Sequence, residues 1–390
     1  MRIVFAIALL LGMTGGGSAA NLTLACLDIG QSVAACRSAA EEFSRSTGHT
    51  VRVVSADAIG RSSLENYQAL FSVDSARIDV LQYPDSWGPA LSGDLQELAP
   101  LSDAAAYVGG SAAAFRGRRI GWPQHLGIVV LMVRNNVVGN KIDVWSQLRE
   151  KLLAAPTDGA SGLSLGAADP TLFAFFLDWI YSLGATGLDD RAVVEHALTV
   201  LGDLIGSVVK PGAVGATTAD ATALFLEGQA AVLVTRSPRA GIVAAQHEGE
   251  DVSTNALPRL EGASGSVLAT VWYAGVSRYS AEPDAAEALA AFLAAPQTQA
   301  AAAKTFGLAP TYRALYNDPA VRDAGPILAQ IASVVDDLRT LPVNVYGLSF
   351  LELSDTVAET VRRLMRGEID AASGANAIAR ASRRATRLTE

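Results

Sequence analysis

Strand and helix patterns alternate along this sequence, and that alternation restricts the possible fold more than any other feature. Residues 21–27 and 77–84 are short apolar runs typical of buried strands, and residues 49–56 alternate apolar and polar side chains. Residues 32–48 have the apolar spacing of a helix that ends at Gly48. Strands joined by helices in this way predict an α/β fold, with a largely parallel sheet covered by helices on both faces.

The same pattern continues along the rest of the chain. Residues 163–169 and 230–236 predict further strands, and residues 170–184 predict a buried helix that starts at a proline. Residues 284–307 predict a pair of alanine-rich helices broken at Pro296. A mature chain of about 370 residues is longer than one ordinary core requires, so we expect two lobes.

The first residues have the layout of a secretory signal peptide. Arg2 supplies a positive start, residues 3–13 form an apolar core, and residues 18–20 form a small-residue cleavage site. No later segment reaches the roughly 20 apolar residues that a transmembrane helix needs. We therefore expect a periplasmic protein from which residues 1–20 have been removed.

The two cysteines, Cys26 and Cys36, lie close together in the mature chain, with none left over. In an oxidising compartment this favours a disulfide between the first strand and the following helix. Two alternatives stay open. Residues 22–26 form a loose lipobox, so Cys26 could carry a lipid anchor, or both cysteines could be free thiols in a core.

Several classes of function lack the residues that they need. A formal charge of −9 argues against a nucleic-acid partner, and we expect the arginine-rich residues 379–387 to be a solvated helix end. The four histidines are widely separated, so we expect no metal site built by the protein. No glycine-rich nucleotide loop and no G-x-S-x-G nucleophile turn occur, so we expect no cofactor and no catalytic activity.

Six segments carry motifs that occur together, in this order, in one known family. They are residues 39–54, with the end of a helix followed by S-T-G-H-T-V-R-V-V; residues 77–101, with I-D-V and G-D-L-Q-E-L; residues 118–138; residues 142–152, with W-S-Q-L; residues 223–238, with F-L-E-G-Q-A-A-V; and residues 257–321, with L-Y-N-D-P near the end. In this order they resemble the extracellular solute-binding proteins of the maltose/trehalose type (family 1), components of ATP-binding-cassette (ABC) importers.

The resemblance implies a two-lobe periplasmic binding-protein fold of the type II-like class, in which two α/β lobes joined by a hinge close on a ligand between them. The N-terminal lobe would contain residues 21–126 plus 278–336, and the C-terminal lobe residues 127–277 plus 337–390. Such a protein captures a small polar solute, here with a sugar, disaccharide or polyol favoured, and delivers it to the membrane permease subunits of the importer. We expect it to act as a monomer.

Sugar sites combine flat aromatic faces with carboxylate, amide or guanidinium groups that hydrogen-bond to hydroxyls. Such residues follow the predicted strands, or match positions from which members of the family reach the ligand. The candidates are Asp28, Gln31, Tyr83, Asp85, Trp87, His125, Asp169, Arg236, Trp272 and Tyr273, with Arg61 and Tyr67 as weaker ones. The alternative is core packing for the tryptophans and tyrosines, a helix cap for the two aspartates that precede helices, a core or surface position for the histidine, and a surface salt bridge for Arg236.

Five positions depart from the family pattern. An acidic residue is usual where Pro84 stands, a cleft tyrosine is common at His125, and some members have aspartate at Gly127. Many members have tryptophan at Ser237 and arginine at Leu341. A non-sugar ligand, such as an organic anion, an amine metabolite or a cofactor, therefore stays open. Arg236 or His125 beside few carboxylates would favour an anion, whereas several carboxylates with two aromatics would favour a carbohydrate or a cation. A secreted hydrolase with an unrecognised triad is the third hypothesis.

Overall fold

The computed structural model describes residues 19–56, 62–111, 114–139, 142–155, 162–210, 212–246, 251–260 and 266–388. Nearly all of the predicted signal peptide, and Arg61, lie outside these residues. Among the helices of the described residues, none is both long enough and apolar enough to cross a membrane.

The strands form one long mixed sheet and one small hairpin. The main sheet has the order β2-β1-β3-β10-β6-β8-β7, while β9 and β11 also pair with β6, and β12 pairs with β10. The strands are β1 (Asn21–Leu27), β2 (Thr50–Ala56), β3 (Val80–Pro84), β4 (Ala114–Phe115), β5 (Arg118–Arg119), β6 (Trp122–Arg134), β7 (Leu163–Leu165), β8 (Val232–Arg236), β9 (Val252–Ala256), β10 (Val267–Val276), β11 (Ala309–Pro310) and β12 (Leu338–Thr340).

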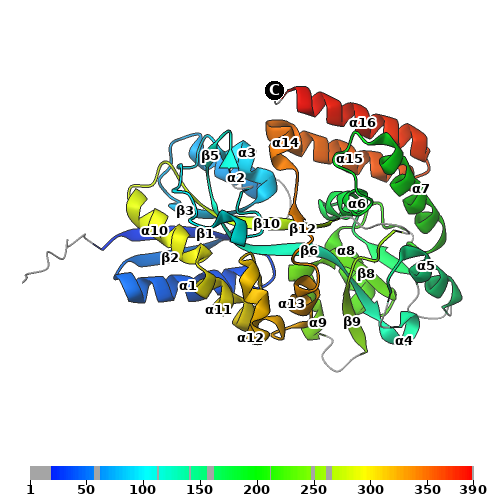
Figure 1. Cartoon of the computed structure of the whole chain (residues 1–390), viewed down its shortest axis with the longest axis horizontal. Coiled ribbons are helices and arrows are strands. Elements are labelled where there is room, and N and C mark those ends of the chain that lie inside the picture. Colours follow the sequence, from blue (N-terminus) through cyan, green and yellow to red (C-terminus); the bar gives the residue numbers. More distant parts are fainter. Residues whose placement is uncertain are drawn as a thin grey trace, which may run out of the picture.

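Helices cover the sheet on both faces, as the sequence predicts (Figure 1). The prediction of a largely parallel sheet is wrong, because β10 runs antiparallel to β3 and β6, and β6 runs antiparallel to β8 and β9. The α-helices are α1 (Ser32–Thr47), α2 (Ser62–Phe71), α3 (Gly88–Leu91), α4 (Asn135–Val138), α5 (Trp145–Ala154), α6 (Thr171–Ser182), α7 (Arg191–Ser207), α8 (Thr218–Leu226), α9 (Ser237–Gln246), α10 (Pro283–Ala294), α11 (Pro296–Phe306), α12 (Pro319–Arg322), α13 (Pro326–Ala332), α14 (Val343–Tyr346), α15 (Phe350–Met365) and α16 (Ala371–Arg387). Short 3-10 turns are η1 (Asp85–Trp87), η2 (Ala104–Ala106), η3 (Arg313–Asn317) and η4 (Gly347–Ser349).

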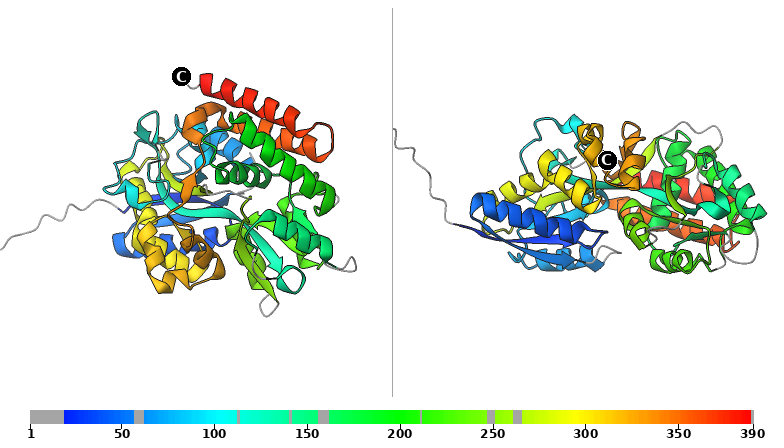
Figure 2. Two further views of the ribbon diagram at one scale, coloured as in Figure 1. Left: turned by 45° about the vertical axis from the view of Figure 1, so that its right-hand side comes forward. Right: turned by 90° about the horizontal axis from the view of Figure 1, so that it is seen from below.

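Strand β6 joins the two lobes of the molecule. Its residues up to Ile128 pair with β10, and its residues from Val129 onward pair with β8. In Figure 1 it crosses the middle of the molecule, from the lobe that holds β1, β2 and β3, here called the first lobe, to the lobe that holds β7, β8 and β9, here called the second lobe. Figure 2 shows the two lobes side by side from two further directions. The predicted two-lobe α/β fold is confirmed.

The second lobe is built around helix α6, which is apolar on all sides. Its aromatic residues pack against α5, where the ring centroids of Trp145 and Trp179 lie 4.8 Å apart and those of Trp145 and Phe175 5.7 Å apart. A helix that is apolar all round must be covered on every side. Helices α7 and α15 pack against α6, and α16 covers both of them from outside (Figure 1).

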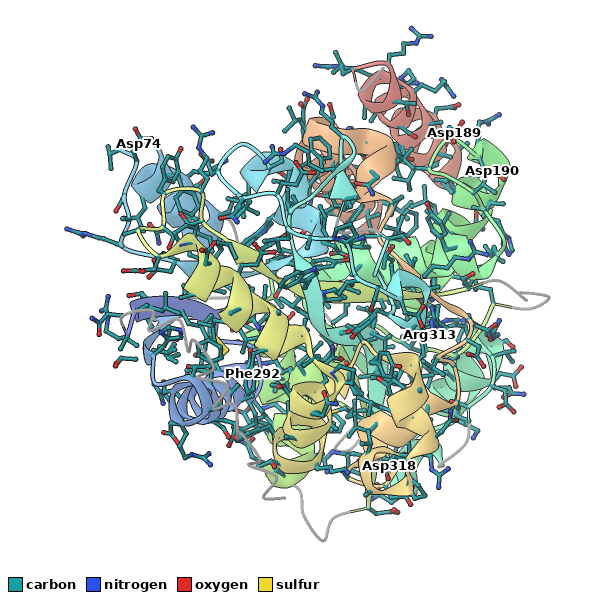
Figure 3. All side chains as sticks on the ribbon, turned by 60° about the vertical axis from the view of Figure 1, so that its left-hand side comes forward. Asp74, Asp189, Asp190, Phe292, Arg313 and Asp318 are labelled. Atoms are coloured by element: carbon teal, nitrogen blue, oxygen red, sulfur yellow. A yellow bond between two sulfur atoms is a disulfide. The ribbon has the colours of Figure 1, made fainter. Side chains whose placement is uncertain are left out.

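In the first lobe, helices α1 and α10 pack together beside strand β1. Phe43 of α1 and Phe292 of α10, which is labelled in Figure 3, have ring centroids 5.5 Å apart. Gly48 ends α1 in the left-handed conformation with φ of 78°, and Pro296 occupies the first turn of α11. Both predicted helix boundaries are confirmed, because glycine tolerates a positive φ and proline cannot continue a helix.

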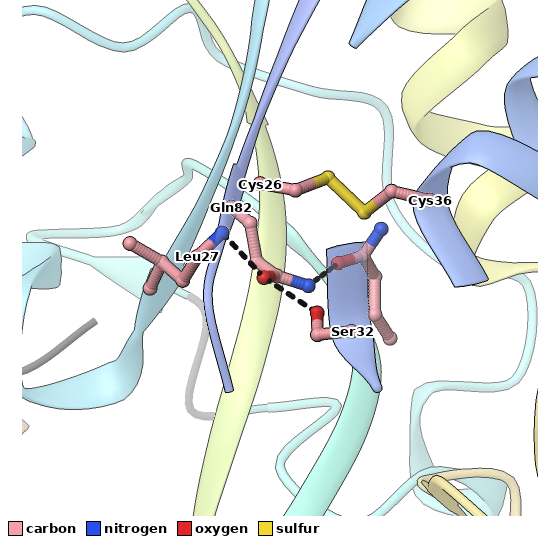
Figure 4. The surroundings of a disulfide bond; sticks show 6 residues. Cys26, Leu27, Ser32, Cys36 and Gln82 are labelled. Carbon is pink, nitrogen blue, oxygen red and sulfur yellow. Dashed lines mark hydrogen bonds between the residues drawn. A yellow bond between two sulfur atoms is a disulfide. The ribbon is translucent and has the colours of Figure 1, made fainter. Parts of the chain in front are cut away.

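A disulfide joins Cys26 of β1 to Cys36 of α1, across 6.6 Å between their Cα atoms (Figure 4). Beside it, Gln82 Oε1 of β3 accepts hydrogen bonds from the Leu27 N–H and the Ser32 hydroxyl, each 3.0 Å long. The predicted pairing is confirmed. The bond uses the sulfur atom that a lipid anchor at Cys26 would need.

Candidate functional site

Candidate residues from both lobes stand at or just after the carboxyl ends of strands. Asp28 follows β1 and Asp85 follows β3 in the first lobe, while Asp169 follows β7 and Arg236 ends β8 in the second lobe. In open α/β sheets, ligands bind beyond the carboxyl ends of the strands, where loops leave space for them. The region between the lobes is therefore the candidate site.

The lobes touch through two glycines that leave room for Pro238. A Cβ atom added to Gly30, in the loop after β1, would lie 2.7 Å from the backbone oxygen of Pro238 in the first turn of α9. A Cβ added to Gly127 of β6 would lie 3.0 Å from Pro238 Cδ and 3.1 Å from Trp272 Cζ3. These close approaches place Pro238 between the first lobe and the strand that crosses to the second.

Trp272 is the centre of a stack at the base of this region. The imidazole of His125 is stacked on its indole, with ring centroids 5.1 Å apart and planes inclined by 18°. The guanidinium carbon of Arg236 lies 5.5 Å from the centroid of the same indole, within the range of a cation–π interaction. Burial lowers the pKa of His125 to about 3, so its ring is neutral at physiological pH. Arg236 supplies the positive charge of the stack.

Asp85 places a carboxyl group of the first lobe near Arg236 of the second. It is 2% exposed, and its oxygens accept the N–H of Ser86 at 2.9 Å and the N–H of Val271 at 3.4 Å. Burial raises the pKa of Asp85 to about 7, while these N–H groups and Arg236 oppose the rise. Burial likewise lowers the pKa of Arg236, and the charges of Asp85 and Asp169 raise it. The three charges therefore interact across the lobe boundary.

Asp169 also has the contacts of a helix cap. One carboxylate oxygen accepts the N–H of Thr171 at 3.0 Å, in the first turn of α6, and the other accepts the N–H of Thr218 at 2.6 Å, in the first turn of α8. Carboxylates stabilise helix starts in this way. Asp169 thus fixes two helices of the second lobe while it contributes charge beside Arg236.

Asp28 and Gln31 have exposed side chains on either side of Gly30. They flank the contact between Gly30 and Pro238, where the first lobe meets the second. Because both side chains are exposed, their carboxylate and amide groups are accessible to a ligand between the lobes.

All four aromatic candidates are buried: Trp272 is 4% exposed at the base of the site, and the other three contact core residues. Tyr83 and Tyr273 have ring centroids 5.7 Å apart, and the Tyr273 hydroxyl donates a 3.0 Å hydrogen bond to the Gly109 carbonyl. Trp87 packs edge to face against Tyr67, with centroids 6.3 Å apart. Of the adjacent pair Trp272 and Tyr273, only Trp272 contacts His125 and Arg236, because neighbouring residues of a strand point to opposite faces.

A group of glutamines beside His125 was not predicted from the sequence. Gln82 Nε2 donates a 2.9 Å hydrogen bond to Gln124 Oε1, and both line a cavity of about 40 Å³ together with His125 and Gln299. His125 Nε2 is buried and has no hydrogen-bond partner among the described residues. The signal was present in the sequence, since polar Gln82 and Gln124 interrupt otherwise apolar strands.

The described residues contain no group of three or more His, Cys, Asp or Glu side chains placed to hold a metal ion. Ser237, at a position that often holds tryptophan in the family, has a structural contact instead: its hydroxyl accepts the Ile128 N–H at 3.1 Å. This bond connects the start of α9 to the point where β6 passes between lobes.

Residues 30–300 match the family model described as bacterial extracellular solute-binding protein. A curated relative from Deinococcus radiodurans, named as a probable ABC transporter-binding protein, is 24% identical over 91% of this chain and 92% of its own length. Among solved structures, the maltose-bound MalE3 of T. maritima is 20% identical, with a TM-score of 0.81 over 95% of this chain and 100% of that one.

A second solved structure, the GacH receptor of Streptomyces glaucescens, determined unliganded and with acarbose, is 18% identical, with a TM-score of 0.81 over 96% of this chain and 100% of that one. At these identities the likeness concerns the fold of the whole chain.

Proposed function

This chain belongs to the bacterial extracellular solute-binding proteins, and we propose that it is the substrate-binding component of an ABC importer with a carbohydrate ligand. The observation that carries the proposal is the group formed by Arg236, Trp272 and Asp85 at the boundary of the two lobes. The solved relatives with bound maltose or acarbose support a carbohydrate. Export through a signal peptide at residues 1–20 and delivery to permease subunits are parts of the same proposal.

Closure of the lobes would assemble the site. The first lobe contributes Asp28, Gln31 and Asp85, and the second contributes Arg236, so neither lobe alone holds the full set of polar groups. We place the crossing between lobes near Ile128 in β6 and before Trp272 in β10. This is supported by the pairing of β10 with β3 from Trp272 onward, which draws that half of β10 into the first lobe.

The charges favour a neutral carbohydrate over an anion. Arg236 is the cation of the site, but the carboxyl groups of Asp85 and Asp169 act on it electrostatically. Asp28 adds a further carboxylate after strand β1 of the first lobe. An anionic ligand would have to compete with these carboxylates for the guanidinium. Sugar hydroxyls can instead donate to carboxylates and accept from Arg236 at the same time.

A thermal-shift screen of the purified mature protein against maltose, trehalose, polyols, organic acids and amines tests the ligand class. A ligand that binds only the folded state raises the melting temperature. We expect a rise with at least one carbohydrate, and a rise only with an organic acid would refute the carbohydrate assignment.

Binding and catalysis are separated by a second measurement on the same sample. The ligand found by the screen is incubated with the protein and recovered for mass spectrometry, while small-angle scattering follows lobe closure. An importer component closes and returns the ligand unchanged. If the protein converted many molar equivalents of the ligand to a product of different mass, it would be a hydrolase instead.

A further inference from the structure

The C-terminal helix α16 carries its positive charge on a single face. Residues three and four apart on a helix lie on the same side, and the arginines of α16 follow this spacing. They are all exposed, and are Arg380, Arg383, Arg384 and Arg387. The opposite face is formed by small and apolar residues that are buried against α7 and α15, among them Ala375, Ile378 and Ala385. We call the four arginines the arginine stripe.

The arginine stripe has little compensating negative charge around it. Among the described residues, Glu352 pairs with the stripe, 3.7 Å from Arg384, with both side chains more than 70% exposed. Exposed pairs of this kind contribute little. On neighbouring α15, by contrast, Arg362 and Arg366 form ion pairs with Glu359 at 2.9 and 2.8 Å. The stripe is thus a local positive region on a chain with a formal charge of −9.

Exposed apolar side chains border the arginine stripe. Leu388 is 65% exposed and lines the same shallow surface hollow as the four arginines. Val345 and Leu348, 51% and 62% exposed, lie on α14 and η4, which are tied to α16 by a 3.1 Å hydrogen bond between the hydroxyls of Tyr346 and Ser382. Large apolar residues are exposed at only two other places in the described residues.

We propose that the arginine stripe and Leu388 bind the surface of a membrane rich in anionic phospholipid. Guanidinium groups form paired hydrogen bonds with phosphate oxygens, and an anionic bilayer offers phosphates at high density to every arginine of the stripe. Exposed leucine beside arginine suits the interface, where the apolar side chain enters the headgroup boundary. A lipid surface fits this region better than a folded partner, because the four arginines and Leu388 lie along a single helix around one open surface hollow.

Binding is transient, since a handful of charges gives a weak, salt-sensitive attraction rather than a permanent anchor. It would keep the protein near the membrane independently of the ligand between the lobes. The arginine stripe lies on a face of the second lobe and is remote in sequence from every ligand-site candidate. Membrane binding can therefore be tested independently of the proposed function.

Co-sedimentation with vesicles tests the inference on the full mature chain. Vesicles of phosphatidylglycerol and phosphatidylcholine are compared with vesicles of phosphatidylcholine alone, at low salt. Each arginine near an anionic surface contributes about a fivefold increase in partitioning, so Arg383→Gln/Arg387→Gln should lower binding to anionic vesicles by about 25-fold. The wild-type protein should also be released by about 0.5 M salt, because screening then acts over a few ångströms.

The matched control is Arg37→Gln/Arg77→Gln, which removes the same charge from two exposed arginines of the first lobe. It should bind anionic vesicles like the wild type. The inference is overturned if the wild type shows no preference for anionic vesicles, or if both double variants lose binding equally. Melting temperatures show whether both variants are folded. If either variant is unfolded, release of the wild type from anionic vesicles by salt tests the inference, and wild-type binding that salt does not weaken would overturn it.

Discussion

Replacing Gly30 by alanine tests whether the lobes close through the contact between Gly30 and Pro238. Gly30 has a φ of +58°, and an added Cβ would lie 2.7 Å from the backbone oxygen of Pro238. Because that oxygen belongs to the main chain, no side-chain rotation can relieve the overlap. Either the loop after β1 or the start of α9 must move away.

Two separate costs follow from this geometry. A positive φ costs alanine about 1–2 kcal/mol, and this cost is present whether the lobes are open or closed. Overpacking against Pro238 costs about a further 1–3 kcal/mol, and this cost is present only where the lobes meet. Only the second cost opposes closure, so the affinity for ligand should fall by about 5- to 150-fold, since about 1.4 kcal/mol corresponds to a factor of ten.

Gly48→Ala is the matched control. Gly48 has a similar φ of +78°, but an added Cβ would meet no atom within 4 Å. Both variants should lose stability to a similar degree in denaturant unfolding, whereas only Gly30→Ala should weaken binding in calorimetry with the sugar found by the thermal-shift screen. Scattering should also show a larger radius of gyration for ligand-bound Gly30→Ala. Equal affinity for Gly30→Ala and the wild type would refute the reasoning.

Three further predictions concern the site and the disulfide. Arg236→Gln should weaken sugar binding by about 10- to 100-fold in calorimetry, because a charged hydrogen-bond donor contributes about 1.5–3 kcal/mol. Arg236→Lys should lose only part of this binding free energy. Unchanged binding by Arg236→Gln would remove Arg236 from the site. The pKa of Asp85 is raised to about 7 in the folded state, so the wild type should lose stability relative to Asp85→Asn as the pH rises from about 4 to about 7. Melting temperatures of both proteins measured across this pH range test the prediction, and parallel profiles would contradict the burial of that carboxyl. Cys26→Ser/Cys36→Ser should lower the free energy of unfolding in urea by about 3 kcal/mol. A reductant should lower the free energy of unfolding of the wild type by a similar amount and leave that of the variant unchanged.

The predicted helix ends depended on local patterns in the sequence, and these patterns were sufficient to place them. Gly48 and Pro296 end and start helices where the sequence places them, because the backbone preferences of glycine and proline act on the nearest residues. The pairing of Cys26 with Cys36 needed only one strand and the next helix to lie side by side. The resemblance then supplied the two lobes, which the paired strands of β6 confirm.

The candidate site was predicted less completely, because burial and cap contacts depend on residues far away in the sequence. Trp87 and Tyr273 follow or occupy strands near the site, yet both pack into the core. Asp169 caps α8, which begins 49 residues later, through its bond to Thr218. No pattern within one segment indicates which distant N–H group a carboxylate will meet.

The sequence by itself determined the class of fold, the helix ends and the residue types from which a site could be built, since these depend on periodicity, backbone preference and composition. It favoured the disulfide, which the structure then confirmed. The tertiary structure alone decided that Trp272, and not its neighbour Tyr273, meets His125 and Arg236, and that Pro238 fits against Gly30. These contacts join strands from two lobes, and their geometry follows from the register in which β6 pairs with β10 and β8. Such register is set by packing across the whole molecule, so it cannot be derived from any one stretch of the chain.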